Sequence, residues 1–474
     1  MIKLYNSLTE IRSDIASGEA TVEKLVKNHL VNIGRLAHLN AFNEVFEHEA
    51  LACARAVDLK IKQGNAGKLA GMVIAIKDNI CYKNHIVSAS SKILEGFTAI
   101  YSSTIVQRVL AEDAVIIGRC NCDEFAMGGA NENSFFGPVK NFADNTRVSG
   151  GSSGGSAVAV QANMCQAALG TDTGGSVRQP ASFCGLIGLK PTYGRISRHG
   201  IIAYASSFDQ VGTITRSIED AEALLETMAG PDGYDSTLST AAVPSLTQDI
   251  KTTGPKKIAY LQDALSSHGV DNEVKSVLIK YIEKLRDEGH TVKPIVFEYL
   301  DYLVPSYYIL AMAEASSNLS RYDGVHYGYR SPAAVDLQST YKLSRSEGFG
   351  KEVKRRIMLG TFVLCAGYYD AYFAKAQKVR RLIQKQTDEI LNEFDFILVP
   401  TAPEPAFQIG KEEKDPVLTY LHDIFTVQAS LTGVPAISLP SGNNSKGLPL
   451  GLQLLTKHFN EQELLNFSKY FLKL

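Results

Sequence analysis

The sequence predicts an α/β fold, in which a mixed, mostly parallel central sheet is covered by helices on both faces. Short apolar runs of strand length recur at residues 71–76, 114–118 and 167–170, and stretches of helical length lie between them. Alternating buried strands and helices are typical of a sheet covered on both sides. The chain has 474 residues, of which 45% are hydrophobic and 21% charged, as expected for a globular protein with a large core.

We expect a single domain over residues 1–474, built from three parts. N-terminal helices occupy about residues 1–60. The sheet core is expected over about 65–230 and 393–474. Between these two parts, a surface connection rich in Gly, Pro, Ser and Thr leads into a helical insertion, and together they occupy about 231–392.

Local signals place the individual elements. Ser7 and Glu10 have the spacing of a capping box, which predicts a helix start ahead of Ile11, and a second helix is expected to begin near Thr21. Residues 123–128 predict a short helix or loop. Further helices are expected at 103–111, 156–165, 217–230, 272–288, 299–392 and 461–474, and further strands at 257–261, 394–400, 436–440 and 450–455.

Charge and cysteine content exclude several classes of protein. The net charge of −2 gives no bulk electrostatic preference for nucleic acid or an anionic membrane. Seven scattered cysteines favour a reducing cytoplasm over a disulfide framework. Cys120 and Cys122 lack a second Cys/His pair at metal-binding spacing, so we expect buried thiols there and no metal. We expect no secretory segment, because the first residues lack an apolar h-region, and no membrane span, because no apolar run approaches the ~20 residues that cross a bilayer.

Two glycine–serine clusters, at residues 150–156 and 171–176, are the most distinctive feature of the chain. Such composition is typical of flexible linkers, but apolar segments of core quality flank both clusters. We therefore interpret them as tight loops inside a folded domain. Loops of this kind also cradle phosphate on backbone N–H groups, although no lysine follows either cluster as it does in nucleotide-binding loops.

Serine nucleophilic chemistry is the remaining interpretation. The sequence has no G-x-x-x-x-G-K-[ST], G-x-G-x-x-G, H-E-x-x-H or G-x-S-x-G motif. A serine that attacks a carbonyl needs a proton acceptor, and no histidine lies in a motif of this kind. Lys77 ends an apolar strand, where desolvation would lower its pKa toward the neutral amine. The alternative is that Lys77 extends from the strand end to water.

Taken together, these motifs resemble the amidase signature family over about residues 20–460. The resemblance is carried by the two clusters, whose Ser152 and Ser176 lie 24 positions apart (176 − 152), and by Lys77 in Ala-Ile-Lys-Asp-Asn. It implies the amidase signature fold and a Ser-cisSer-Lys triad. Ser176 is then the nucleophile, and Ser152 is the bridging serine after a cis peptide bond. Lys77 is the base.

The resemblance also implies roles for the residues around Ser176. The backbone N–H groups of Thr173, Gly174 and Gly175 would form an oxyanion hole. Asp172 and Arg178 are expected to hold this loop rather than to react.

Within the family, the chain is most similar to the A subunits of glutamyl-/aspartyl-tRNA amidotransferases. Those subunits hydrolyse glutamine to ammonia, which a partner subunit uses to amidate misacylated tRNA. The resemblance therefore implies a cytoplasmic heterotrimer with B and C subunits, tRNA bound mainly through the B subunit, no cofactor in this chain, and ATP with Mg²⁺ in the partner. The segments that carry the similarity are residues 188–197, 205–210, 313–324, 353–360, 423–428 and 431–435.

Two other functions stay open from the sequence. A stand-alone amidase that hydrolyses other small amides would share the same triad and differ in its pocket. A non-catalytic phosphate- or RNA-binding module would use the glycine loops, but the near-neutral charge argues against it.

Free glutamine carries one carboxylate and one ammonium, so its pocket requires one cation and one anion. The family positions assign the carboxylate to Arg356, the ammonium to Asp423 and closure of the pocket to Tyr307. The neighbouring Arg355 is an alternative carboxylate ligand. Without the family resemblance, an arginine such as Arg356 is more often found on a solvated helix face, and an aspartate such as Asp423 more often caps a helix.

Overall fold

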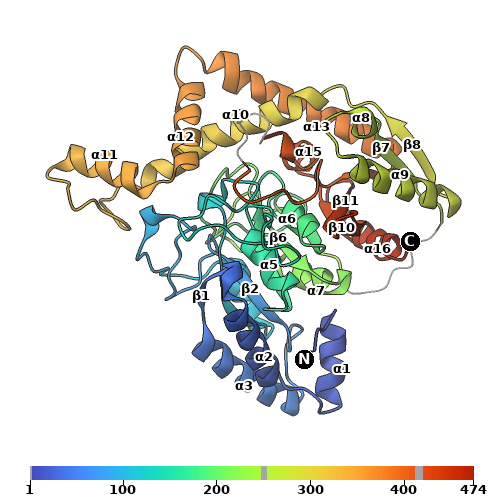
Figure 1. Cartoon of the computed structure of the whole chain (residues 1–474), viewed down its shortest axis with the longest axis horizontal. Helices are drawn as coiled ribbons and strands as arrows, with labels where there is room; N and C mark the ends of the chain where they lie inside the picture. Colours follow the sequence, from blue (N-terminus) through green and yellow to red (C-terminus); the bar gives the residue numbers. More distant parts are fainter. Residues whose placement is uncertain (1–2, 247–253, 412–419) are drawn as a thin grey trace.

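The computed structural model describes residues 3–246, 254–411 and 420–474, and its centre is a single sheet of eleven strands (Figure 1). In the order in which they lie across the sheet, the strands are β1 (Phe42–Val45), β3 (Val115–Cys120), β2 (Val73–Lys77), β4 (Ala167–Asp172), β6 (Gln210–Thr215), β5 (Ile187–Lys190), β10 (Ala436–Asn443), β11 (Pro449–Leu455), β9 (Phe396–Pro400), β7 (Lys257–Leu261) and β8 (Thr291–Ile295).

The mixed character of the sheet is confirmed, but the expected predominance of parallel pairs is not found. Within the described residues, the four pairs β3–β2, β2–β4, β9–β7 and β7–β8 are parallel. The other six neighbouring pairs are antiparallel. Parallel pairing is thus confined to two blocks, and the antiparallel strands β6, β5, β10 and β11 join them.

Both faces of the sheet are covered. Every residue of β2, β3, β4, β5, β6, β9 and β11 is buried. Because side chains alternate between the two faces of a strand, complete burial requires cover on both sides. The flanking helices are α1 (Leu8–Ala16), α2 (Val22–Arg35), α3 (Glu47–Gln63), α4 (Thr104–Ala111), α5 (Gly154–Gln161), α6 (Arg178–Phe183), α7 (Ile218–Met228), α8 (Asp263–Ser266), α9 (Asn272–Asp287), α15 (Val427–Thr432) and α16 (Glu461–Phe471).

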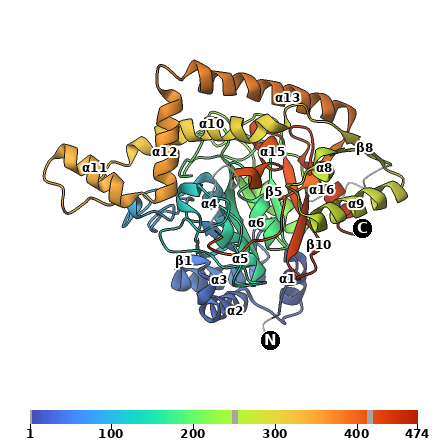
Figure 2. The ribbon, with the colours of Figure 1, turned by 45° about the horizontal axis from the view of Figure 1, so that its top comes forward.

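The helical insertion lies along one side of the sheet core, and α11 extends farthest from it (Figure 2). Its helices α10 and α13 pack against each other and against α15, while α10 also packs along α12. None of the helices that the structure describes is long and apolar enough to cross a membrane. The insertion comprises α10 (Leu300–Asn318), α11 (Leu337–Gly348), α12 (Lys351–Leu364), a π-helical turn (Asp370–Ala374) and α13 (Lys375–Glu393).

Most of the predicted helices and strands are present within a few residues of their expected bounds. Ser7 caps α1 by accepting from the N–H of Glu10, although Glu10 accepts in return from Asn6 rather than from Ser7. The strands β1, β5, β6 and β8 were not predicted, because they are short or rich in glycine, threonine and polar residues. β1 and β8 extend the sheet into the stretches assigned to the N-terminal helices and the insertion. Residues 247–253 of the predicted connection lie outside the described residues.

Candidate active site

The site forms where the parallel strands β2 and β4 end side by side. Ile76 pairs with Leu169, so the next residue of β2, Lys77, reaches the same edge as Thr171 of β4. The Nζ of Lys77 is hydrogen-bonded to Ser152 Oγ at 2.7 Å and donates to Thr171 Oγ1 at 3.0 Å. The lysine therefore contacts the serine of the first cluster and a threonine at the start of the second.

Burial suits Lys77 to the role of a base. Its side chain is fully buried, and this desolvation lowers the pKa of Lys77 to about 8. Burial alone does not distinguish it, because burial also lowers the pKa of Lys190 to about 7. The Nζ of Lys190, however, donates to the carbonyl of Pro191 at 3.0 Å, whereas that of Lys77 reaches a serine hydroxyl.

The backbone brings the two serine clusters together. The Gly151–Ser152 peptide bond is cis, as the family resemblance implied. The N–H of Ser153 donates to the carbonyl of Ser176 at 3.1 Å, and Ser153 Oγ donates to the carbonyl of Thr171 at 3.2 Å. Lys77 and Ser152 are completely buried, whereas Ser176 keeps 8% of its surface exposed. Of the three residues, Ser176 is therefore the only one with surface open to solvent.

The loop that ends in Ser176 is held from both sides. Thr173 Oγ1 donates to Asp209 Oδ1 at 2.7 Å, and Thr426 Oγ1 donates to the carbonyl of Gly174 at 2.6 Å. A side chain at Gly174 would begin 2.5 Å from the hydroxyl of Tyr307, so only glycine fits under that ring. Within the part of the chain that the structure describes, no hydrogen bond engages the N–H groups of residues 174–176. These N–H groups remain available to an oxyanion.

Asp172 and Arg178 hold the two ends of this loop, as expected. Both side chains are fully buried and form a two-point ion pair, with Arg178 Nη2 and Nε at 2.9 and 3.0 Å from the carboxylate oxygens of Asp172. Arg178 Nη1 also donates to the carbonyl of Thr426. The ion pair thus connects the end of β4, the start of α6 and the segment before α15.

A cavity of about 210 Å³ is lined by the expected cation and anion, and by Gly129 and Ala130, which lie against Gln179 and Gly151. Lys77, Ser152 and Ser176 are not among its lining residues. Arg356 and Asp423 both line it, and so does Arg355. Arg356 is buried and donates to the hydroxyl of Tyr204 and to Glu352, each at 2.9 Å. Arg355 is more exposed and pairs with the other carboxylate oxygen of Glu352. Arg356 is therefore held rigidly at the cavity, which favours it as the carboxylate ligand.

Asp423, one of three carboxylates that line the cavity with Glu132 and Glu352, is the anion that was expected there. Burial raises the pKa of Asp423 to about 6, while the hydroxyl of Tyr308, which donates to its Oδ2 at 2.6 Å, opposes the rise. Tyr308 lines the cavity, whereas Tyr307 packs against Gly174 in the loop that ends in Ser176, and its closure of the pocket stays a prediction. Consecutive helix residues point about 100° apart, so only one of the two tyrosines reaches each place.

Several residues near the site were not predicted from the sequence. Asp123 accepts from the N–H groups of Asn131 and Asn133, and a side chain at Gly151 would clash with its carboxylate. Gln179 accepts a hydrogen bond from the N–H of Gly151 at 3.1 Å. The other unpredicted residues that contact the loop or line the cavity are Thr171, Asp209, Tyr308, Glu352, Tyr420 and Thr426.

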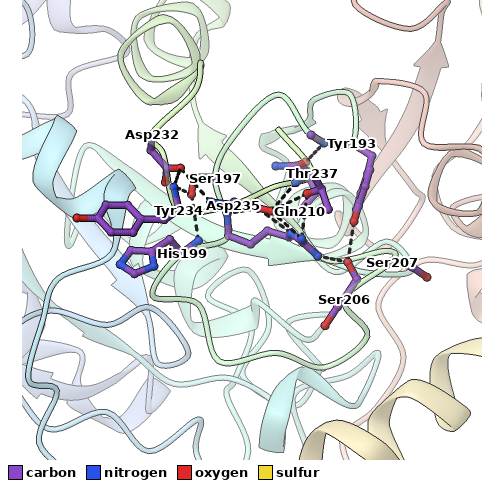
Figure 3. Close-up of polar contacts among 12 residues, drawn as sticks. Tyr193, Ser197, His199, Ser206, Ser207, Gln210, Asp232, Tyr234, Asp235 and Thr237 are labelled. Carbon is purple, nitrogen blue, oxygen red and sulfur yellow. Dashed lines mark hydrogen bonds and ion pairs between the residues drawn. The ribbon is translucent and has the colours of Figure 1, made fainter. Parts of the chain in front are cut away.

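A second polar cluster, around Arg198 and Asp235, holds the turn before residue 238 (Figure 3). Arg198 makes a two-point ion pair with Asp235, at 2.8 and 2.9 Å, and donates to Thr237 Oγ1. Burial acts to raise the pKa of Asp235, but hydrogen bonds from Arg198 and Thr237 hold it well below its usual range. Burial also acts to raise the pKa of Asp232, but hydrogen bonds from Ser197, Thr104 and two backbone N–H groups lower it to about 2.

The donor set near the site does not suggest a metal centre. Among the described residues, no group of three or more His, Cys, Asp or Glu side chains is placed to hold a metal ion. All seven cysteines are free thiols, and Cys120 and Cys122 are both buried.

Comparison with known proteins adds to this geometry. A family model described as Amidase matches residues 24–465. The A subunit of glutamyl-tRNA(Gln) amidotransferase from Chlorobium luteolum is 49% identical over 468 residues, which cover 98% of this chain and 96% of that protein. The crystal structure of the corresponding protein from Thermotoga maritima has a TM-score of 0.78 at 39% identity and covers 94% of this chain and 90% of that one. Native peptide amidase from Stenotrophomonas maltophilia has a TM-score of 0.81 at 27% identity, with coverage of 98% and 95%.

Proposed function

The chain belongs to the amidase family, and from this premise we propose that it is the glutamine-hydrolysing A subunit of a tRNA-dependent amidotransferase. The contact that carries the chemistry is the 2.7 Å hydrogen bond between Lys77 Nζ and Ser152 Oγ in a fully buried setting. The amidotransferase is favoured over a stand-alone amidase because identity reaches 49% with the amidotransferase protein and 27% with the peptide amidase.

In the proposed reaction, Ser176 Oγ attacks the side-chain amide carbon of glutamine. Neutral Lys77 takes the proton of Ser176 through Ser152, and the same relay returns it to the departing ammonia. The negative charge on the amide oxygen is stabilised by the N–H groups of the loop 173–176. Water then cleaves the γ-glutamyl ester at Ser176 and releases glutamate.

The ends of glutamine have matching groups in the cavity. Arg356 takes the α-carboxylate and Asp423 takes the α-ammonium. Tyr308 stabilises Asp423 in its orientation through the hydrogen bond to its Oδ2. Substrates without this zwitterionic end would lose both contacts.

The partners follow from the same proposal. Ammonia passes to a B subunit, in a complex with a C subunit in the cytoplasm, and is used there on glutamate that is misattached to a glutamine tRNA. Aspartate on an asparagine tRNA is a second acceptor of the same kind. The B subunit handles the tRNA together with ATP and Mg²⁺.

The test uses the assembled three-subunit complex with Ser176→Ala. We expect glutamine-dependent formation of amidated tRNA to be lost, while formation with added ammonium salt continues, because ammonia bypasses the amidase site. Persistent glutamine-dependent product would contradict the assignment of Ser176. A wild-type complex that forms no amidated tRNA with either nitrogen donor would contradict the proposed function itself.

A further inference from the structure

Gln179 lies between the cavity and the loop that carries Ser152, and one end of its amide has no partner. Its side chain is 1% exposed. The Oε1 atom accepts from the N–H of Gly151 at 3.1 Å. The Nε2 atom is buried and, within the described residues, forms no hydrogen bond. Buried amide donors are almost always paired, with protein or with ordered water, so this one marks a position beside the cavity that an acceptor completes.

The orientation of this amide is determined by its surroundings. The N–H of Gly151 is a donor, so the atom that faces it must be the carbonyl oxygen of Gln179. The opposite end of the same group is then the NH₂, which can only donate. Whatever occupies the space beside Nε2 therefore has to supply an acceptor.

That space opens toward the cavity at Gly129. A side chain at Gly129 would begin 3.5 Å from Gln179 Nε2 and 3.9 Å from Asp423 Oδ1. Gly129 and Asp423 both line the cavity. The missing side chain thus leaves one space that is bordered by the unpaired donor and by the carboxylate that takes the substrate ammonium.

We propose that Gln179 is a substrate-positioning residue whose Nε2 donates a hydrogen bond to the α-carboxylate of glutamine. This inference rests on the proposed function. Glutamine offers two acceptors, and its side-chain carbonyl faces the N–H groups of the loop that ends in Ser176. The α-carboxylate is bonded to the carbon that carries the ammonium, so it lies close to Asp423 and within reach of Gln179.

The arrangement ties substrate binding to the reactive loop. One planar amide holds the N–H of Gly151 at one end and the substrate at the other. When the α-carboxylate of glutamine occupies the space beside Gly129, its hydrogen bond to Gln179 therefore restrains Gly151, the residue that precedes Ser152. Gln179 acts through position, because its amide neither gains nor loses a proton in the reaction.

The experiment compares two substrates in the complete complex with Gln179→Glu, at a pH of about 8, well above the pKa of about 6 of the neighbouring buried carboxylate of Asp423. Glutamate keeps an acceptor for Gly151 but replaces the donor by a negative charge. For glutamine, we expect kcat/KM to fall about tenfold or more, mainly through KM. For 4-aminobutanamide, which lacks only the α-carboxylate, we expect the variant to retain at least half of the wild-type kcat/KM.

The result that overturns the proposal is an equal loss for both substrates, or no loss for glutamine. Gln179→Met provides the matched contrast, because it removes both ends of the amide and should lower kcat with both substrates. A wild-type complex that hydrolyses no glutamine would instead count against the proposed function, so the two failures are distinguishable.

Gly129→Ala supplies a second variant that tests the same space from the other side. Its methyl group would meet neighbours at ordinary contact distance, so we expect the chain to fold. Because the methyl group occupies the place of the substrate head, KM for glutamine should rise about tenfold with little change in kcat. An unchanged KM would show that the head group lies elsewhere and would overturn the assignment.

Discussion

The active site and the Arg198–Asp235 cluster are both dense networks of polar side chains, but they differ in how completely their groups are paired. In the cluster, the guanidinium fork of Arg198 meets both oxygens of Asp235, and Thr237 completes the set. In the active site, Lys77 is buried without a carboxylate in contact, and Gln179 Nε2 has no partner among the described residues.

The difference separates a structural network from a functional one. In the cluster, hydrogen bonds from Arg198, hydroxyl groups and backbone N–H groups rigidify a turn and lower the pKa of both carboxylates against the opposing effect of burial, so that they stay ionised. Unpaired, desolvated groups lower the stability of the fold. They are retained at functional sites, where a substrate supplies the missing hydrogen-bond partner or the group takes up a proton during the reaction. Removing a group should therefore affect mainly activity in the active site and mainly stability in the cluster.

The largest effect is expected from Lys77→Met, which keeps the length of the side chain and removes the amine. Glutamine hydrolysis by the assembled complex should fall about a thousandfold, because no base remains for the serine proton. The free energy of unfolding should change by less than about 1.5 kcal/mol, because an apolar group suits the buried place. Ammonia release and denaturant unfolding measure the two quantities.

Lys190→Met is the matched control for this prediction. Lys190 is also buried with a lowered pKa, but it contacts a backbone carbonyl. We expect its loss to leave the rate of glutamine hydrolysis within about threefold of wild type. If Lys77→Met retained a normal rate at neutral pH, or if both variants lost activity equally, the distinction between the two lysines would be wrong.

The second prediction concerns the paired region. Arg198→Met leaves Asp235 buried without its fork, and the free energy of unfolding should fall by about 2 kcal/mol, less than for a fully buried pair because the guanidinium is partly exposed. The denaturant midpoint measures this loss. Glutamine hydrolysis at a temperature where the variant is folded should stay within about twofold of wild type. A normal midpoint with a slow reaction would reverse the roles of the two regions.

Sequence reasoning recovered the parts of this comparison that have local signals. Lys77, Ser152 and Ser176 lie in long motifs, and their proximity followed from the family pattern. The proportion of parallel strand pairs could not be predicted from the sequence, because the antiparallel strands β5 and β6 carry glycine and polar residues that weaken a strand signal.

The neighbours of the site depend on contacts between distant segments. Gln179 contacts Gly151 and lies beside Gly129 and Asp423, which come from three other parts of the chain. No spacing within one segment predicts such a meeting. Likewise, the choice of Tyr308 as the residue that lines the cavity depends on how α10 is rotated against the sheet core, which sequence periodicity does not determine when both positions are buried.

The smallest effect, about fivefold, is expected from pH, and it separates the two regions without any substitution. The pKa of Lys77 is lowered from 10.5 to about 8, so about a tenth of the molecules carry the neutral base at pH 7. We expect kcat/KM for glutamine to rise about fivefold from pH 7 to pH 8, which is above the range where Asp423 titrates and below the range where free glutamine loses its ammonium. Between pH 8 and 10.5 the unfolded chain binds more protons at this lysine, so its contribution to stability also rises with pH.

The carboxylates of the paired region respond at the opposite end of the scale. The pKa of Asp232 is lowered from 3.8 to about 2 and that of Asp235 is also lowered, so the unfolded chain takes up protons first as the solution is acidified. Their contribution to stability is complete above about pH 4 and is lost as the pH falls toward about 2. Rate and unfolding midpoint, measured on the same samples, should therefore change in separate windows. A rate that is flat from about pH 7 to 9, or a rise that survives in Lys77→Met, would show that the buried amine is not the group that titrates.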